Sequence, residues 1–281
     1  MAASRIAWTP ELEETGAERA RPPWGEPLAE SDYEALGSSW ITREIADAAM
    51  LRRVDDFTGR DILGQKKRDC AGIAFLYYWP GEPNLRSYRI RRDNPDYGVG
   101  KDGRPKPERK YLAPPGGGNR IYVPPGITLD ELANVEIPIA LVEGEKKALA
   151  LLRLARHEST TLRFIPIAIA GVWNWRGVVA KIGGPKGERI DVKGPIPDLG
   201  RIVWKGRIVY IVFDADVATN GSVRWARKGI ARELAQRNAG VRFVNIPENC
   251  GAKAIDDLLV LLGPERAVSY THLTLPTNRE V

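Results

Sequence analysis

The chain has 281 residues, of which 43% are hydrophobic and 28% are charged, so its composition excludes a fibrous or wholly disordered protein. Its two cysteines, Cys70 and Cys250, lie in neither a CxxC motif nor a Cys/His cluster, which argues against a disulfide framework or a zinc ribbon. The formal net charge of +6 favours a polyanionic partner, because Lys and Arg side chains displace counterions from phosphates.

The N-terminal segment, residues 1–37, is rich in Glu, Pro and Ala and has few large aliphatic side chains. Such a composition buries too little apolar surface to offset chain entropy, so it predicts a flexible leader. The first residues lack the basic and then apolar layout of a secretory signal, and no apolar run of the sequence is long enough to span a bilayer. We therefore expect a cytoplasmic protein with no membrane partner.

Residues 38–134 are predicted to form a small basic α+β unit. The spacing of Ile41, Ile45 and Ala49 predicts a helix in the first half of residues 38–63. Aromatic and β-branched residues then flank a Pro-Gly-Glu-Pro turn in the segment from Gly72 to Asp93. This pattern predicts two antiparallel strands joined by that turn.

A basic stretch follows these strands. From Arg86 to Lys110 there are nine Lys and Arg residues against four acids, with tyrosines between them. Such a stretch can follow the phosphate backbone of single-stranded DNA while bases stack on the aromatic rings. The alternative is a solvated loop whose charge only confers solubility. The candidate nucleic-acid-binding residues are Arg89, Arg91, Arg92, Lys106, Arg109 and Lys110.

Residues 135–264 change to an alternating α/β pattern. The predicted strands are IPIALVEG, FIPIAIAG, GRIVYIVFDAD and VRFVNIP, and the predicted helices are EKKALALLRLARH, VRWARKGIARELAQRNAG and AIDDLLVLLG. Strands that are apolar on both faces and separated by helices indicate a four-stranded, mostly parallel sheet covered on both sides. Residues 265–281 show no periodic apolar set, so we expect an unstructured tail, either an appendage or a cloning artefact.

Two acidic clusters lie where α/β folds place ligands, at the carboxyl ends of parallel strands. Glu143 ends the first predicted strand, and Asp214 and Asp216 end the third. Carboxylates at neighbouring strand ends repel one another unless a cation lies between them, and their oxygens suit Mg²⁺ or Mn²⁺, which also hold substrate phosphates. The sequence therefore predicts a metal site with these three ligands, the alternative being ordinary surface carboxylates.

Several motifs in this order resemble a known family. The glutamate at one strand end and the Asp-x-Asp at a later one look like the signature of the Toprim superfamily. The segments KYLAPPGGGNRIYVPPG, LVEGEKKALAL, AGVWNW, FDADVATN and GAKAIDDLL more narrowly resemble the Toprim-like, DUF3854-like domain of phage and plasmid primase-type proteins. The resemblance extends from about Gly72 to Gly263 and implies a Rossmann-like Toprim domain after the basic unit.

The resemblance also implies roles for individual residues. Glu143 matches a glutamate proposed as general acid or base, and Asp214 and Asp216 match a metal-coordinating pair. Ala218 stands where topoisomerases usually have a third aspartate, which argues against a topoisomerase.

Three further groups of residues each have two interpretations. Lys146 is a candidate catalytic residue that would add positive charge near a phosphate, as would Lys147 unless it faces solvent. The pair Asp256 and Asp257 matches site acids of the narrower family, or it serves only as first-turn acids of a helix. The tryptophans of GVWNWRG either stack on bases or pack in the core.

The function expected from these features is a primase-like, Mg²⁺-dependent nucleotidyl-transfer or nucleic-acid-processing module of a phage, plasmid or other mobile element. Its partners would be single-stranded DNA, nucleotides and a replicative helicase. A metal-dependent nuclease and a non-catalytic DNA-binding accessory are the alternatives. The chain contains no GxxxxGK[ST] motif, so it is not expected to be an ATP-driven helicase itself.

Overall fold

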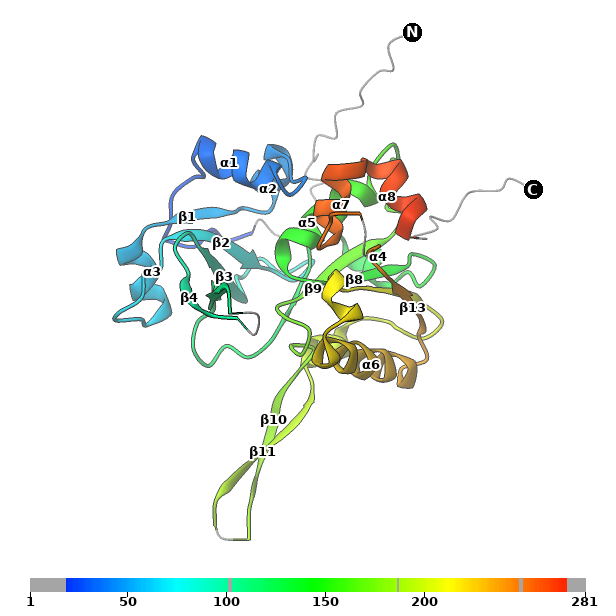
Figure 1. Ribbon diagram of the computed structural model, residues 1–281. Helices are drawn as coiled ribbons and strands as arrows, with labels where there is room; N and C mark the ends of the chain where they lie inside the picture. Colours follow the sequence, from blue (N-terminus) through cyan, green and yellow to red (C-terminus); the bar gives the residue numbers. More distant parts are fainter. Residues whose placement is uncertain (1–18, 101–102, 186, 248–249, 272–281) are drawn as a thin grey trace, which may run out of the picture.

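A five-stranded mixed sheet forms the centre of the C-terminal half of the protein (Figure 1). The computed structural model describes residues 19–100, 103–185, 187–247 and 250–271. The strand order is β13-β12-β8-β9-β7, and only the edge strand β7 is antiparallel to its neighbour. The strands are β7 (Ile121–Tyr122), β8 (Ile139–Glu143), β9 (Ile165–Ile169), β12 (Ile208–Val212) and β13 (Gly240–Val244).

The four parallel strands are those predicted, but the fifth strand was missed. β7 comes from the segment assigned to the basic unit, and its Ile121 and Tyr122 are fully buried. Two residues are too few to show a periodic pattern, so only their pairing with β9 reveals the strand. The sheet is therefore five-stranded. It crosses the expected boundary between residues 134 and 135, because β7 lies before that boundary and β9 lies after it.

Helices pack against this sheet, whose central strands are buried on both faces, and against one another. They are α4 (Leu129–Ala133), α5 (Glu145–Ala155), α6 (Gly221–Gln236), α7 (Ile255–Leu262) and α8 (Pro264–Thr271). Helix α8 corrects the prediction of an unstructured tail, since Ala267 is buried and α8 packs against α7. The rest of that predicted tail, residues 272–281, lies outside the described part of the chain.

A four-stranded antiparallel sheet occupies the N-terminal half, in the order β1-β2-β3-β6. It contains β1 (Arg52–Val54), β2 (Gly72–Tyr77), β3 (Ser87–Arg92) and β6 (Tyr111–Leu112). The predicted pair around the Pro-Gly-Glu-Pro turn is confirmed as β2 and β3. The segment 38–63, expected to begin as one helix, forms α2 (Arg43–Ala48), β1 and α3 (Asp56–Leu63), because Thr42 and Asp55 each cap a new helix.

The predicted leader is also partly wrong. Residues 30–37 form α1 (Glu30–Gly37), and Leu28 and Leu36 are buried against the rest of the core. Glu26 pairs with Arg53 of β1 through backbone hydrogen bonds of 2.8 Å. A few aliphatic side chains are enough here because the segment docks on an existing surface, which composition alone does not reveal. Residues 1–18 of the predicted leader lie outside the described residues.

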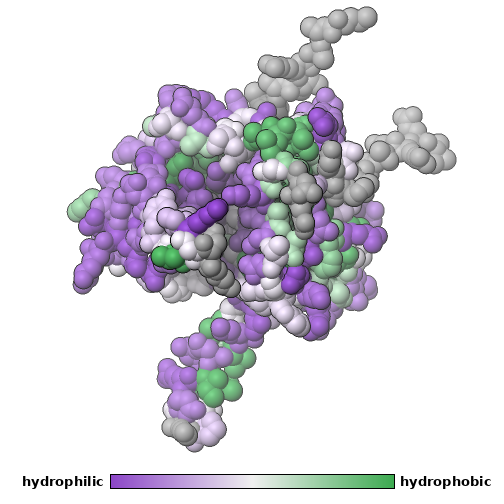
Figure 2. All heavy atoms as spheres, in the orientation of Figure 1, coloured by the Kyte–Doolittle hydropathy of each residue, from purple (hydrophilic) through white to green (hydrophobic). Residues whose placement is uncertain are grey.

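Two hairpins extend outward from these sheets. β4 (Asp96–Val99) pairs with β5 (Pro105–Glu108) in a short exposed hairpin of the basic stretch. The longer hairpin of β10 (Arg176–Gly183) and β11 (Arg189–Pro195) projects away from the body (Figure 1). Its paired Ile182 and Ile190 are exposed, so apolar side chains lie on a projecting arm (Figure 2). Within the described ranges, no helix is long and apolar enough to cross a membrane.

Candidate functional site

The register of the parallel strands brings the predicted acids to one edge of the sheet. Val142 of β8 pairs with Val212 of β12, so Glu143 and Asp214 both lie at the carboxyl edge of these neighbouring strands. Burial raises the pKa of the Glu143 carboxyl, and the charges of Asp214 and Asp216 raise it further, while Lys147 lowers it. Glu143, Asp214 and Asp216 are therefore close enough to interact, although they are far apart in sequence.

Lys147 is the direct partner of this acidic edge. Its Nζ lies 2.7 Å from Oδ1 and 2.8 Å from Oδ2 of Asp214. Burial alone would lower the pKa of Lys147, but the ion pair with Asp214 outweighs it and raises the pKa. Burial likewise raises the pKa of Asp214 against the opposing effect of Lys147. Lys147 thus neutralises the carboxylate edge and is not a solvated surface lysine.

The two aspartates at the start of α7 have different roles. Oδ2 of Asp257 accepts hydrogen bonds from the backbone N–H groups of Lys253 and Ala254, at 3.0 and 3.2 Å, which caps the helix. Asp256 is buried, and its Oδ1 has no hydrogen-bond partner among the described residues. Its charge acts on Lys146, Lys147 and Asp214. Asp256 therefore belongs to the acidic edge, whereas Asp257 stabilises α7.

Lys146, in α5, interacts electrostatically with Asp256 and with two cations of the basic stretch, Arg91 and Lys110. Its pKa is lowered to about 8, mainly by burial and also by the charges of Arg91 and Lys110, while Asp256 and Asp257 act in the opposite direction. The sequence suggested positive charge near a phosphate at this position, and the structure brings four cationic side chains together there: Arg91, Lys110, Lys146 and Lys147.

The donor set at the edge fits a hard divalent cation. All candidate ligands are carboxylate oxygens, and the buried Oδ1 of Asp256 lacks a partner. The oxygens of Glu143, Asp214 and Asp216 do not all lie within 4.8 Å of one another; among the described residues, His157, Glu158 and Glu265 form such a group. Mg²⁺ usually keeps several water ligands and binds through one or two carboxylates, so it does not require closer convergence.

Part of this site lies in a segment with a known family match. Residues 131–266 match the family described as Domain of unknown function (DUF3854). The DUF3854 match includes Glu143, Lys147, Asp214 and Asp256, and it excludes the antiparallel sheet with its basic residues. No curated protein matches the chain.

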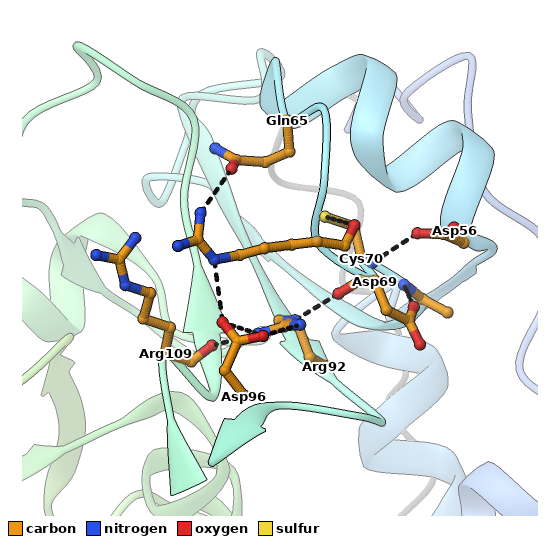
Figure 3. A network of polar contacts seen from close by, with 9 residues as sticks. Asp56, Gln65, Asp69, Cys70, Arg92, Asp96 and Arg109 are labelled. Atoms are coloured by element: carbon orange, nitrogen blue, oxygen red, sulfur yellow. Dashed lines mark hydrogen bonds and ion pairs between the residues drawn. The ribbon is translucent and has the colours of Figure 1, made fainter. Parts of the chain in front are cut away.

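Outside the DUF3854 match, Arg92 does not have the exposed position that its place in the basic stretch suggested. Only 1% of its side chain is exposed. Its guanidinium donates to the backbone oxygens of Asp69 and Arg109 and to the carboxylate of Asp96 (Figure 3). Arg68 also reaches Asp96, at 3.0 Å. Arg92 therefore holds β3 against neighbouring loops and cannot contact a phosphate backbone.

Arg89 is also bound internally. Its Nη1 lies 2.8 Å from Oε1 of Glu145, and that carboxylate, which is fully buried, also accepts a hydrogen bond from the Tyr77 hydroxyl. The Arg89 guanidinium lies over the ring of Tyr111 at 4.6 Å from its centroid. Glu145 thus joins α5 to the antiparallel sheet. Of the two glutamates in this motif, Glu143 belongs to the candidate site and Glu145 has a structural role.

The other predicted basic residues remain accessible. Lys106, Arg109 and Lys110 are exposed, and Arg91 is half-buried with an Nε atom that lacks a partner in the described chain. The two tryptophans of GVWNWRG also differ in exposure. Trp175 packs in the core, while Trp173 is 39% exposed and its indole N–H donates to Ser222. The basic surface is therefore smaller than the sequence suggested, and it adjoins the acidic edge through Arg91 and Lys110.

Proposed function

We propose that this chain carries a Toprim-like, divalent-metal-dependent module that transfers nucleotidyl groups or processes nucleic acid, as in primase-type proteins of phages and plasmids. One observation carries the proposal: Glu143 and the Asp214–Lys147 pair lie together at the carboxyl edge of neighbouring parallel strands. In open α/β sheets this edge is where ligands bind. The DUF3854 match of the same segment is compatible with the proposal.

Each residue of the edge has a chemical role in this proposal. Asp214 and Asp216 would hold Mg²⁺ or Mn²⁺, and Asp256, whose charge acts on Asp214, would add further negative charge. The bound cation would neutralise charge on phosphate oxygens and help to align the attacking oxygen. Glu143 has a raised pKa, which suits a carboxyl group that accepts a proton from an attacking hydroxyl or donates one to a leaving oxygen.

The cationic residues would position the substrates. Lys146 and Arg91 lie beside the acidic edge and would contact a phosphate close to the reacting bond. The exposed Lys106, Arg109 and Lys110, on the β4–β5 hairpin and the segment between β5 and β6, would hold single-stranded DNA. We also propose that the protein is cytoplasmic and that a replicative helicase is its partner.

A strand assay tests this function. A labelled single-stranded template with a primer and nucleotides is incubated with the protein and Mg²⁺, and we expect the labelled strands to grow. The double variant Asp214→Asn, Asp216→Asn should reduce the rate at least about 100-fold, because it removes the carboxylate ligands. Lys205→Gln is the control, since Lys205 is exposed and precedes the amino end of β12.

Two results would contradict nucleotidyl transfer. Strands that become shorter would assign the site to a metal-dependent nuclease. The second result has two parts: the wild-type protein neither lengthens nor shortens the labelled strands, and the double variant keeps full biological activity. This result would assign the chain to a non-catalytic DNA-binding role.

A further inference from the structure

A polar pocket lies beside the acidic edge, between the two large sheets. It has a volume of about 220 Å³, and the polar residues that line it include Tyr77, Ser87, Arg89, Asn119, Arg120 and Asn174. None of the lining residues that the structure describes is acidic. A pocket with two guanidinium groups, hydroxyls and amides but no carboxylate has the chemistry of an anion site.

The strand register places this pocket next to Glu143. Ile169 of β9 pairs with Glu143 on one side and with Ile121 of β7 on the other. Arg120 immediately precedes Ile121, and Asn174 belongs to the loop that follows β9. The pocket is therefore about one strand away from the acidic edge, at the same end of the sheet.

The two arginines of the pocket differ in their partners. Arg89 is held in place by Glu145, and its charge acts on Glu143. Arg120 forms no ion pair among the residues that the structure describes, and its buried Nε atom has no hydrogen-bond partner. Arg120 is half-buried, and a buried N–H donor without an acceptor costs free energy because its lost hydration is not replaced. An anionic ligand would supply the missing partner.

A glycine-rich segment borders the same pocket. Gly116 and Gly118 have φ angles of 77° and 65°, and a Cβ atom on Gly117 would lie 3.8 Å from Oγ of Ser87. Glycine adopts these positive φ angles without strain and leaves the backbone N–H groups accessible. Successive backbone N–H groups of this kind are suitable donors to phosphate oxygens.

We propose that this pocket binds the polyphosphate of a nucleoside triphosphate, with Arg120 and Ser87 contacting phosphate oxygens and Arg89 supporting the pocket from the side of the acidic edge. Its volume is below the about 300 Å³ at the lower limit of typical ligand pockets, so the base would remain outside. This inference rests on the proposed function, because it supplies the nucleotide for the same site.

Calorimetric titration with inorganic tripolyphosphate, without divalent ions and at low salt, tests the pocket directly. We expect saturable binding by the wild-type protein and at least tenfold weaker binding by Arg120→Gln. Asn174→Asp, which places a carboxylate at the pocket, should weaken binding to a similar extent, and Lys205→Gln should bind as the wild type does. Circular dichroism checks that each variant is folded. No saturable binding at millimolar tripolyphosphate, or equal binding by Arg120→Gln, overturns the inference.

Two further ligands identify the source of the phosphates. ATP should bind about as tightly as tripolyphosphate and compete with it, since the base lies outside. An oligothymidylate without a terminal phosphate should not compete; displacement by it, or failure of ATP to bind, would overturn the assignment to a nucleotide. The variant Asp214→Asn, Asp216→Asn should retain tripolyphosphate binding while losing metal-dependent activity, so the pocket and the proposed reaction can fail separately.

Discussion

The acidic edge and the antiparallel sheet both carry many charged residues, but they use them in different ways. At the acidic edge, Lys147 pairs with Asp214, while Asp256 retains an oxygen without a partner in the described chain. In the antiparallel sheet, Arg89 and Arg92 are bound by internal acids and carbonyls. At the acidic edge one carboxylate is thus neutralised by a lysine while Asp256 keeps an oxygen for a ligand, whereas much of the charge within the antiparallel sheet stabilises the fold.

Glu145 and Glu143 give the sharpest test of this difference, because they are two residues apart. Glu145→Ala should lower the free energy of unfolding by about 3–5 kcal/mol, since it leaves the buried Arg89 guanidinium and Tyr77 hydroxyl without their partner. Glu143→Gln should cost much less, because burial already disfavours the charged form of Glu143. Urea unfolding of both variants measures the contrast. Equal losses would show that Glu143 is also a structural acid.

Arg92 and Lys106 provide the second test, within the basic stretch itself. Arg92→Met should lower the free energy of unfolding by about 2–3 kcal/mol, because the carbonyl of Asp69 loses its donor. Lys106→Met should change stability by less than about 0.5 kcal/mol. It should instead weaken single-stranded DNA binding and reduce the slope of log affinity against log salt by about 0.7. Salt-dependent binding titrations and urea unfolding separate the two residues; a stable Arg92→Met variant with weakened DNA binding would reverse their roles.

Lys146 gives the smallest expected effect and tests the boundary between the two regions. Its pKa of about 8 in the folded protein lies below the ordinary 10.5, so the folded state carries a penalty for the charged form at neutral pH. That penalty is complete below pH 8 and disappears as the pH rises toward 10.5, because the folded protein then releases the proton first.

The matched measurement compares wild type with Lys146→Met in metal-free buffer. The stability advantage of the variant should decrease by about 2 kcal/mol between pH 7 and pH 10. Lys205→Met, an exposed control, should show no such trend. If the difference in unfolding free energy between wild type and Lys146→Met does not depend on pH, the folded protein does not disfavour the charged form of Lys146.

Much of the parallel sheet could be predicted because its signals are local. The strands β8, β9, β12 and β13 are short apolar runs, and the helices between them have periodic apolar faces. The same signals failed for β7 and α1. β7 is too short for a pattern, and α1 buries only Leu36 and Asp32, so each depends on a surface made by distant residues.

The sequence by itself determined the alternating α/β order and the placement of Glu143 and Asp214 at strand ends, because side-chain periodicity and strand termini are properties of short segments. Only the tertiary structure decided which charges remain available. It paired Arg89 with Glu145, enclosed Arg92, used Asp257 as a cap and buried Asp256 with one oxygen that has no partner among the described residues. The physical reason is that desolvation and ion pairing depend on neighbours in space, and these neighbours come from segments far apart in the chain.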